Sequence, residues 1–311
     1  MKKVLLDTDI GPDCDDVGAL ALLNRFADAG LCEILGVGHC TSNPFGAPAI
    51  DVICRAYGRA EIPIGTYAGD GFLCDENCQK YNRDLATRYE HRFLHAAAED
   101  AVKMYRRLLA AAEDGSVDFI AIGPLCNLSA LLDSAPDEVS PRSGRELVER
   151  KVKRLTAMAG IFETPDGECL ARAARLCGCP APDFAEYNVF CDIAAAQNVA
   201  THWPGEKVFL GFEAGLILTG ARLSELAPAH PVRRAYELYT ENGLRYSWDL
   251  LTVDFAVCGT GTHFALSERG KVSFTGGGQT RFRPGVGDDR FICYACDGAK
   301  IAADIDAWLV E

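Results

Sequence analysis

The residues best suited to chemistry are concentrated near the amino end, in the segment DTDIGPDCDD at positions 7–16. Five of these ten residues are aspartates, and carboxylates this close together repel one another unless solvent or a cation neutralises them. Carboxylate oxygens are the ligands that calcium and magnesium prefer, and no cluster of Cys or His at ligand spacing accompanies them. The segment therefore predicts a binding site for a hard divalent cation.

Three other interpretations of the acidic segment can be weighed from the residues. An EF-hand loop fails because Pro12 and Gly18 stand where it requires Gly and Glu. A phosphatase of the haloacid dehalogenase type requires Thr or Val two residues after the second Asp, where the chain has Gly11. A solvated turn in which Asp15 and Asp16 cap a helix fits the sequence, but it gives no reason for five carboxylates around a Gly-Pro turn.

The composition narrows the class of partner. The 311 residues carry a formal net charge of -13, which argues against a nucleic-acid backbone or an anionic membrane surface, because both require excess Lys and Arg. The acidity suits a neutral or cationic substrate or a bound divalent metal, and it serves solubility equally well. Apolar residues make up 49% of the chain, enough to bury a sizeable core.

The ends and the cysteines indicate a cytoplasmic protein. No apolar run approaches the ~20 residues of a membrane span, and Asp7 comes too early for the apolar stretch of a signal peptide. We therefore expect the 14 cysteines to be reduced thiols. Cys177 and Cys179 lack the spacing of a zinc pair, and Cys74 with Cys78 lacks a second pair, so no structural zinc is expected.

Short apolar runs alternate with helical patterns, which is typical of an α/β fold with a mostly parallel twisted sheet, helices on both faces and a Rossmann-like core. We expect one domain over residues 1–311, with a small β region at 264–294. Residues 68–89 are expected to form a flap or long loop, and residues 134–145 a surface excursion. The predicted strands are 4–6, 34–37, 119–122, 155–158 and 208–212, and the predicted helices are 17–27, 47–57, 193–200, 232–239 and 300–309.

The acidic segment directly follows the first predicted strand, where ligands of such sheets bind. Here the chain resembles the inosine-uridine-preferring nucleoside hydrolase family, whose amino-terminal signature is DTDPGxDD followed by an apolar helix. The loop is longer in this chain between the Gly and the final Asp pair. Further landmarks similar to the family's follow in order at Ser42-Asn43, Gly123-Pro124-Leu125-Cys126-Asn127-Leu128, Met158-Ala159-Gly160, Glu186-Tyr187-Asn188 and Ser247-Trp248-Asp249.

The resemblance implies a calcium-dependent enzyme that hydrolyses the N-glycosidic bond of ribonucleosides with a metal-bound water. It assigns the calcium to the carboxylates of Asp9, Asp16 and Asp249 and to the main-chain carbonyl of Cys126. Asp9 is also implied as the general base that takes a proton from the water. A main-chain ligand explains why Cys126 can replace the family's Thr.

The same resemblance implies the substrate contacts. Asp15, Asn43 and Asn188 are expected to hydrogen-bond the ribose hydroxyls, Glu186 to lie toward the 5' side, and Met158 to border the substrate. Considered singly, Asn43 is better explained as a turn residue before Pro44, and Glu186 and Asn188 as a polar strand edge. Their order along the chain favours the site.

Two positions depart from the family's pattern. Pro180 stands where the family usually has an Asn that contacts the 5' hydroxyl, and Trp248 replaces the His proposed as proton donor to the leaving base. Trp248 is compatible with stacking on the base, which favours purine nucleosides over uridine and cytidine, or with simple packing in the wall. His91 and His95 are other potential donors, although no spacing supports them.

Two functions therefore remain after the sequence is considered. One is a nucleoside hydrolase of purine salvage, a homo-oligomer (dimer or tetramer) in the resemblance, and the other is a calcium-dependent nucleoside or sugar-binding protein without turnover. The missing His and Asn motivate the second function. The nearly complete set of metal and sugar positions favours the first.

Overall fold

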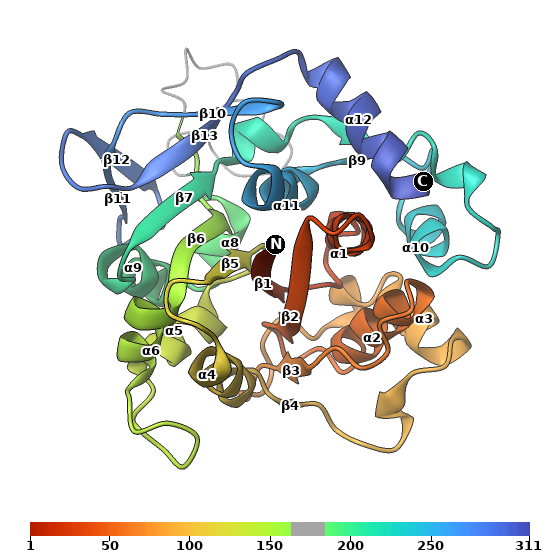
Figure 1. Cartoon of the computed structure of the whole chain (residues 1–311). Coiled ribbons are helices and arrows are strands. Elements are labelled where there is room, and N and C mark those ends of the chain that lie inside the picture. Colours follow the sequence, from red (N-terminus) through yellow and green to blue (C-terminus); the bar gives the residue numbers. More distant parts are fainter. Residues whose placement is uncertain (163–183) are drawn as a thin grey trace.

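The computed structural model describes residues 1–162 and 184–311. The strands of its main sheet are β1 (Lys2–Thr8), β2 (Cys32–His39), β3 (Ile64–Thr66), β4 (Glu99–Asp100), β5 (Val117–Ala121), β6 (Val152–Met158), β7 (Glu206–Leu210), β10 (Phe264–Leu266) and β13 (Arg290–Tyr294). Within the described residues, these nine strands lie in the order β10-β13-β7-β6-β5-β1-β2-β3-β4 (Figure 1). All neighbouring pairs are parallel except β10 with β13. The expected α/β fold is confirmed.

Helices cover both faces of this sheet (Figure 1). One face packs on α1 (Asp15–Asp28), α2 (Gly46–Ala56), α11 (Trp248–Cys258) and α12 (Gly298–Val310). The other packs on α4 (Ala101–Ala111), α5 (Cys126–Asp133), α6 (Gly144–Lys151) and α9 (Ile193–His202). The remaining α-helices in the described part of the chain are α3 (Asn82–Arg88), α8 (Tyr187–Cys191) and α10 (Pro231–Tyr239).

The central strands are buried on both faces, which explains their continuous apolar runs. In β1, Val4 and Leu6 point into the core beneath α1 and α11, whereas Leu5 points into the opposite core. In β5, Ile120 lies in the first core and Phe119 in the second. The two-residue period of a strand therefore divides one apolar run between two cores.

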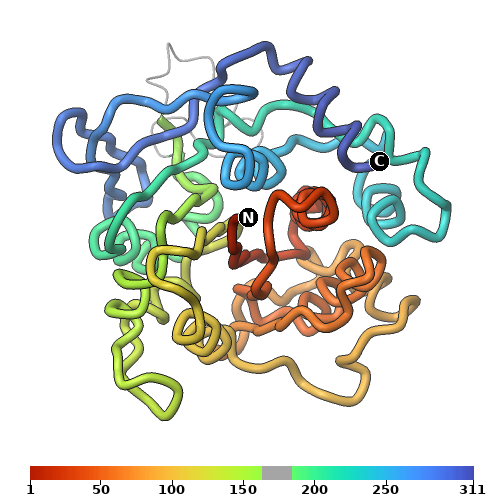
Figure 2. Tube along the Cα trace, in the orientation of Figure 1, coloured from red at the N-terminus to blue at the C-terminus, as the bar shows by residue number. Residues whose placement is uncertain are grey.

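One expectation about an irregular region needs correction. The stretch 68–89 is not only a loop, because it contains a 3-10 turn, η1 (Glu76–Cys78), and helix α3. The expected small C-terminal β region at 264–294 is confirmed. Its hairpin, β11 (Gly270–Phe274) with β12 (Thr280–Pro284), stands apart, but β13 extends the main sheet beside β7. In Figure 2, β13 in blue lies beside β7 in green.

Helices α1 and α11 approach each other closely at Gly18. A Cβ atom there would lie 2.4 Å from the hydroxyl of Tyr236 and 3.0 Å from both methyl groups of Leu250. Because Gly lacks that atom, the two helices pack with their first turns side by side. Among the described residues, no helix is both long and apolar enough to cross a membrane.

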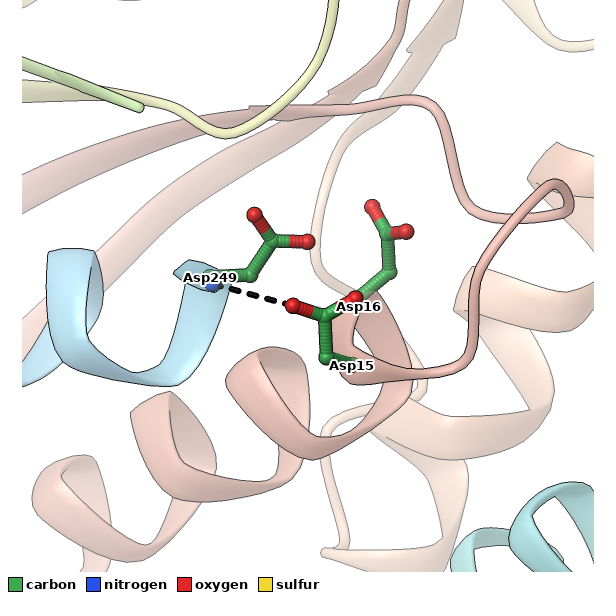
Figure 3. Close-up of side chains that lie close together, drawn as sticks. All are labelled: Asp15, Asp16 and Asp249. Atoms are coloured by element: carbon green, nitrogen blue, oxygen red, sulfur yellow. Dashed lines mark hydrogen bonds between the residues drawn. The ribbon is translucent and has the colours of Figure 1, made fainter. Parts of the chain in front are cut away.

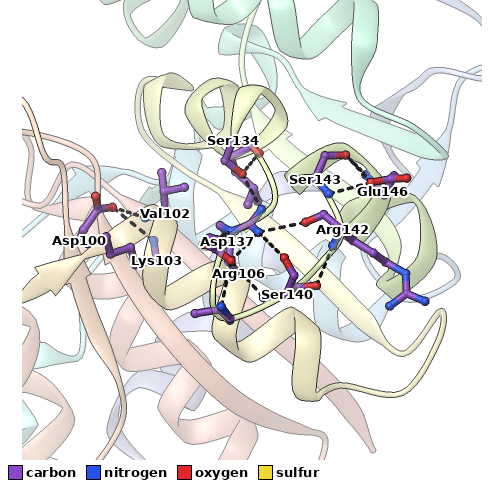
Figure 4. Close-up of polar contacts among 12 residues, drawn as sticks. Asp100, Val102, Lys103, Arg106, Ser134, Asp137, Ser140, Arg142, Ser143 and Glu146 are labelled. Atoms are coloured by element: carbon purple, nitrogen blue, oxygen red, sulfur yellow. Dashed lines mark hydrogen bonds and ion pairs between the residues drawn. The ribbon is translucent and has the colours of Figure 1, made fainter.

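The expected surface excursion at 134–145 is anchored by a buried arginine on α4 (Figure 4). Arg106 is 1% exposed, and its Nε and Nη2 donate to Asp137 at 2.7 and 2.8 Å. The guanidinium also donates to the hydroxyl of Ser134 at 2.9 Å and to the carbonyl of Arg142 at 3.0 Å. One buried cation thus organises a loop that has little core of its own.

We expect Arg106→Ala to lower the free energy of unfolding by about 3 kcal/mol, because it removes a buried charge that satisfies several loop oxygens. The adjacent Arg107 provides a matched control, since its ion pair with Glu99 is 47% and 39% exposed. Arg107→Ala should change the unfolding free energy by less than about 1 kcal/mol. Urea unfolding of both variants measures the difference, and equal losses would contradict the assigned role.

A histidine joins the end of α11 to α12. His263 is buried, and its Nδ1 and Nε2 lie 2.5 Å from Asp254 and 2.9 Å from Asp304. Both ring nitrogens can donate to carboxylates only when the imidazole is protonated. The hydrogen bond with Asp254 raises the pKa of His263, although burial opposes the rise. Lys300 also contacts Asp304, at 2.6 Å.

The stabilisation by His263 should therefore depend on pH. A folded pKa above the unfolded value of about 6.5 means that the contribution is fully present below that value and is lost as the pH rises through the folded pKa. We expect the difference in unfolding free energy between wild type and His263→Gln to be larger near pH 6 than near pH 9. A difference that is constant or grows with pH would show that the ring is neutral in the folded protein.

Candidate active site

A cavity of about 390 Å³ opens at the carboxyl edge of the central strands. This volume is within the usual range for a small-molecule site. Asp9 follows β1, Ile122 follows β5, Met158 ends β6 and Phe212 follows β7, and all four line the cavity. Of the residues predicted from the sequence, eight line it: Asp9, Asp15, Asp16, Met158, Glu186, Asn188, Trp248 and Asp249.

Three aspartates from two helices converge in the cavity (Figure 3). Asp15 and Asp16 occupy the first turn of α1 and Asp249 the first turn of α11, and one oxygen of each lies within 4.8 Å of the others. All three side chains are buried. Oδ2 of Asp15 accepts the backbone N–H of Asp249 at 3.2 Å, while Oδ1 of Asp16 accepts the hydroxyl of Thr8. These bonds leave further carboxylate oxygens available to a cation.

Asp9 lines the same cavity but is not one of these three converging aspartates. The sequence assigned Asp9 to the metal and Asp15 to the sugar, whereas the side chains as they stand group Asp15 with Asp16 and Asp249. The division of roles between Asp9 and Asp15 remains a prediction. The calcium affinities of Asp9→Asn and Asp15→Asn distinguish the two roles.

Burial and mutual repulsion raise the pKa of all four buried aspartates in the cavity, Asp9, Asp15, Asp16 and Asp249. Burial, followed by the charges of Asp9 and Asp15, raises the pKa of Asp16 well above its usual range. Burial also raises the pKa of Asp9 to about 7, with further contributions from Asp13 and Glu186. A divalent cation would reverse these shifts, because it favours the ionised form of each carboxylate. Hard oxygen donors held close together under these conditions fit calcium or magnesium.

The opposite side of the cavity is built around the first turn of α8. Glu186 caps this helix and accepts the backbone N–H groups of Asn188 at 2.8 Å and of Gly160 at 3.1 Å. Burial nevertheless raises the pKa of Glu186 to about 7. The amide of Asn188 donates to the carbonyl of Met158 at 3.1 Å and to that of Ile122 at 3.3 Å. The ends of β5 and β6 therefore fix the orientation of Asn188.

Two predicted residues lie outside the residues that line the cavity. The amide of Asn43 donates to the carbonyl of Cys78 at 2.5 Å. The thiol of Cys126 donates to the carbonyl of Cys40 at 3.1 Å, and Cys126 begins α5. The next residue, Asn127, donates to Asp7 at 2.9 Å and so ties this segment to the end of β1. Pro180 lies outside the described residues.

Residues 4–262 match the model of the inosine-uridine preferring nucleoside hydrolases. The chain belongs to that family. No curated protein matches the chain.

Solved structures share the fold of this family member at low sequence identity. A nucleoside hydrolase of this family from Bacillus anthracis superposes with a TM-score of 0.72 at 20% identity, covering 100% of this chain and 99% of the other. A purine-preferring ribonucleoside hydrolase from Gardnerella vaginalis gives 0.73 at 15% identity, with 99% and 98% covered. A type III effector protein complexed with adenosine diphosphate ribose gives 0.70 at 17% identity, with 99% and 93% covered.

Trp248, which stands where many family members carry His, is held firmly in the cavity wall. Its indole N–H donates to the carbonyl of Phe212 at 2.7 Å, and the rings of Phe212 and Tyr246 lie 5.2 and 5.4 Å from it. A Cβ atom on Gly215 would lie 1.8 Å from the indole ring. The indole therefore lines the cavity, but its donor is already used within the protein.

Much of the outer part of this cavity was not predicted from the sequence. Asp13 pairs with Arg245, which lies on the short strand β9 (Arg245–Tyr246) next to β8 (Leu218–Thr219). No spacing could have revealed this ion pair, because its partners are 232 residues apart. The other lining residues that were not predicted are Pro12, Asn77, Cys78, Lys80, Ile122, Tyr187, Phe212, Tyr239 and Tyr246.

We expect one calcium ion to bind per chain and to raise the thermal stability. A ligand present at 100 times its Kd adds about 2.7 kcal/mol to the unfolding free energy. Asp16→Asn and Asp249→Asn should abolish this increase, whereas Asp28→Asn on the exposed end of α1 should retain it. Prolonged chelation should reverse the stabilisation. A melting temperature that changes neither with added calcium nor with chelator would contradict the metal site.

Calcium affinity distinguishes the role of Asp9 from that of Asp15. We expect Asp9→Asn to weaken calcium binding more than Asp15→Asn, because one oxygen of Asp15 already accepts the N–H of Asp249. Isothermal calorimetry on the two variants gives the affinities directly. A greater loss in Asp15→Asn would instead assign Asp15 to the ion.

Proposed function

We propose that the protein hydrolyses the N-glycosidic bond of ribonucleosides with the help of a bound calcium ion. The observation that carries the proposal is the convergence of Asp15, Asp16 and Asp249 in one cavity with Glu186 and Asn188. Membership of the family supports a hydrolase that acts on N-glycosyl compounds. The cavity supplies both acidic groups for a cation and an amide for sugar hydroxyls.

The proposed ligands of the ion are the carboxylates of Asp9, Asp16 and Asp249 and the main-chain carbonyl of Cys126. When bound, the cation supplies a lowered pKa for water and an anchor for vicinal hydroxyls. Asp9 accepts a proton from the attacking water, because it is buried beside the cluster and lines the same cavity. The surrounding carboxylates stabilise the positive charge that develops on the sugar.

The proposed ribose contacts are Asp15, Asn188 and Asn43. Asn188 is already oriented toward the cavity by the carbonyls of Met158 and Ile122. The contact from Asn43 requires its amide to exchange the carbonyl of Cys78 for a hydroxyl group. Glu186 faces the 5' side in this proposal.

The leaving base is proposed to lie against the aromatic wall that contains Trp248, Tyr239 and Tyr246. Flat apolar surfaces favour the larger face of a purine. We therefore propose that purine nucleosides are preferred over pyrimidine nucleosides.

A screen of ribonucleosides with added calcium tests this function. We expect free base and ribose from inosine, adenosine or guanosine at a higher kcat/KM than from uridine or cytidine, measured by chromatography of the products. A preference for uridine would contradict the purine argument alone. Saturable binding of nucleosides without any product would instead identify a binding protein.

Two variants connect the activity to the proposed residues. Asp9→Ala should lower kcat by more than about 10²-fold, because it removes the base. Cys126→Ala keeps the main-chain carbonyl and should retain most of the activity. A Cys126→Ala protein that folds but binds no calcium would show that the thiol itself is needed.

A further inference from the structure

One cation lies within the aromatic wall of the cavity. Arg245 is half-buried and lines the cavity next to Trp248. Its guanidinium carbon lies 5.3 Å from the ring centre of Trp248 and 5.5 Å from that of Tyr239. A guanidinium at these distances interacts favourably with the ring faces and keeps its charge in place.

Asp13 fixes the orientation of this guanidinium. Nε of Arg245 donates to both oxygens of Asp13, at 2.7 and 2.9 Å, and Nη2 donates to the same carboxylate. An arginine has five N–H donors. Within the described part of the chain, Nη1 has no hydrogen-bond partner, so this end of the fork is available to a ligand. Asp13 belongs to the extra residues between Gly11 and Asp15 that lengthen the acidic loop relative to the family's signature.

Among the described residues that line the cavity, Arg245 and Lys80 are the only cationic side chains. The N–H of Trp248 is used by the carbonyl of Phe212. No histidine of residues 1–162 or 184–311 lines the cavity. The other lining cation, Lys80, is exposed and lies 4.7 Å from the ring centre of Tyr239. Several buried carboxylates line the same cavity, so negative charge on a leaving group is stabilised best beside a cation such as Arg245.

We propose that Arg245 binds the departing base by hydrogen bonds and stabilises its negative charge, with Asp13 as the positioning residue. The inference rests on the proposed hydrolase function and names the group that replaces the missing histidine. In the reaction, water forms the new C1'–O bond and the C1'–N bond breaks. The electron pair of the C1'–N bond passes to the base, and Asp9 receives a proton from the water.

Arginine does not act as an acid in this step. Its guanidinium remains protonated in proteins, so it donates hydrogen bonds to the base without transferring a proton. The departing base anion gains its proton from solvent after the bond has broken, and Asp9 returns its own proton to solvent. The need for Arg245 therefore depends on how poor the leaving group is.

A pair of substrates tests this dependence. The purine base of a nucleoside departs as a poorly stabilised anion. A 4-nitrophenyl riboside instead releases a stable nitrophenolate, which needs no assistance. We expect Arg245→Gln to lower kcat for inosine by about 10²-fold, the usual effect of removing one charge-stabilising donor, and kcat for the nitrophenyl riboside by less than about 3-fold. Asp13→Asn should give a smaller loss with the same selectivity.

Three further proteins serve as controls. The double variant Asp13→Asn/Arg245→Gln removes the unpaired carboxylate that Arg245→Gln alone would leave, and it should show the same selectivity. Arg222→Gln breaks an exposed ion pair with Glu225 away from the cavity and should leave both rates unchanged. Lys80→Gln removes the other cavity cation and should affect both substrates equally. Calcium affinity and melting temperature are measured for each protein.

Each outcome has a distinct meaning. A selective loss on inosine in the Arg245 variants supports the inference. Equal losses on both substrates, with calcium affinity and fold intact, would overturn it and leave the hydrolase function standing, and so would unchanged rates. If the wild-type protein cleaves neither compound, the proposed function fails and the inference fails with it.

Discussion

Repulsion between buried carboxylates is the constraint on which this structure depends. Asp9, Asp15, Asp16 and Asp249 are all buried in one cavity, and each has lost hydration worth several kcal/mol. The aspartates at 15, 16 and 249 lie in the first turns of two helices, whose partial positive charges stabilise a carboxylate by about 0.3–2 kcal/mol. That contribution is too small to offset the desolvation, and the nearby arginine is already paired with Asp13. A divalent cation would supply the missing compensation, because it favours the ionised form of every one of these carboxylates.

The fold was largely accessible to sequence reasoning because its signals are local. The apolar run 4–6 and the apolar helical pattern 17–27 became β1 and α1 with bounds wider by a few residues. Long-range strand pairing was not accessible in the same way. β13 looked like part of a small C-terminal β region, yet its backbone pairs with β7, about eighty residues earlier in the chain. Likewise α3 was missed because its seven residues carry little periodic pattern and pack through contacts with α2.

The candidate site divides in the same way. The acidic loop and the segments around Met158 and Glu186 could be identified because each is a short motif at the end of a strand or the start of a helix. The outer wall could not, since Tyr239 and Arg245 belong to a helix end and a two-residue strand without distinctive spacing. Side-chain partners were equally inaccessible. Nothing in the sequence indicated that the amide of Asn43 would be held by Cys78, or that the N–H of Trp248 would be held by Phe212.

The close packing at Gly18 has a consequence for the choice of ion. Asp16 and Asp249 are carried by α1 and α11, and the separation of these helices is limited by the side chains that meet at Gly18. Calcium takes oxygen ligands at 2.3–2.6 Å and magnesium at 2.0–2.1 Å, a difference of roughly half an ångström. A methyl group at position 18 would meet the hydroxyl of Tyr236 and both methyl groups of Leu250, and these side-chain ends would have to shift to accommodate it. In the proposed metal site, the fit of the ion would therefore depend on helix packing, and substitutions that never touch a ligand would change it.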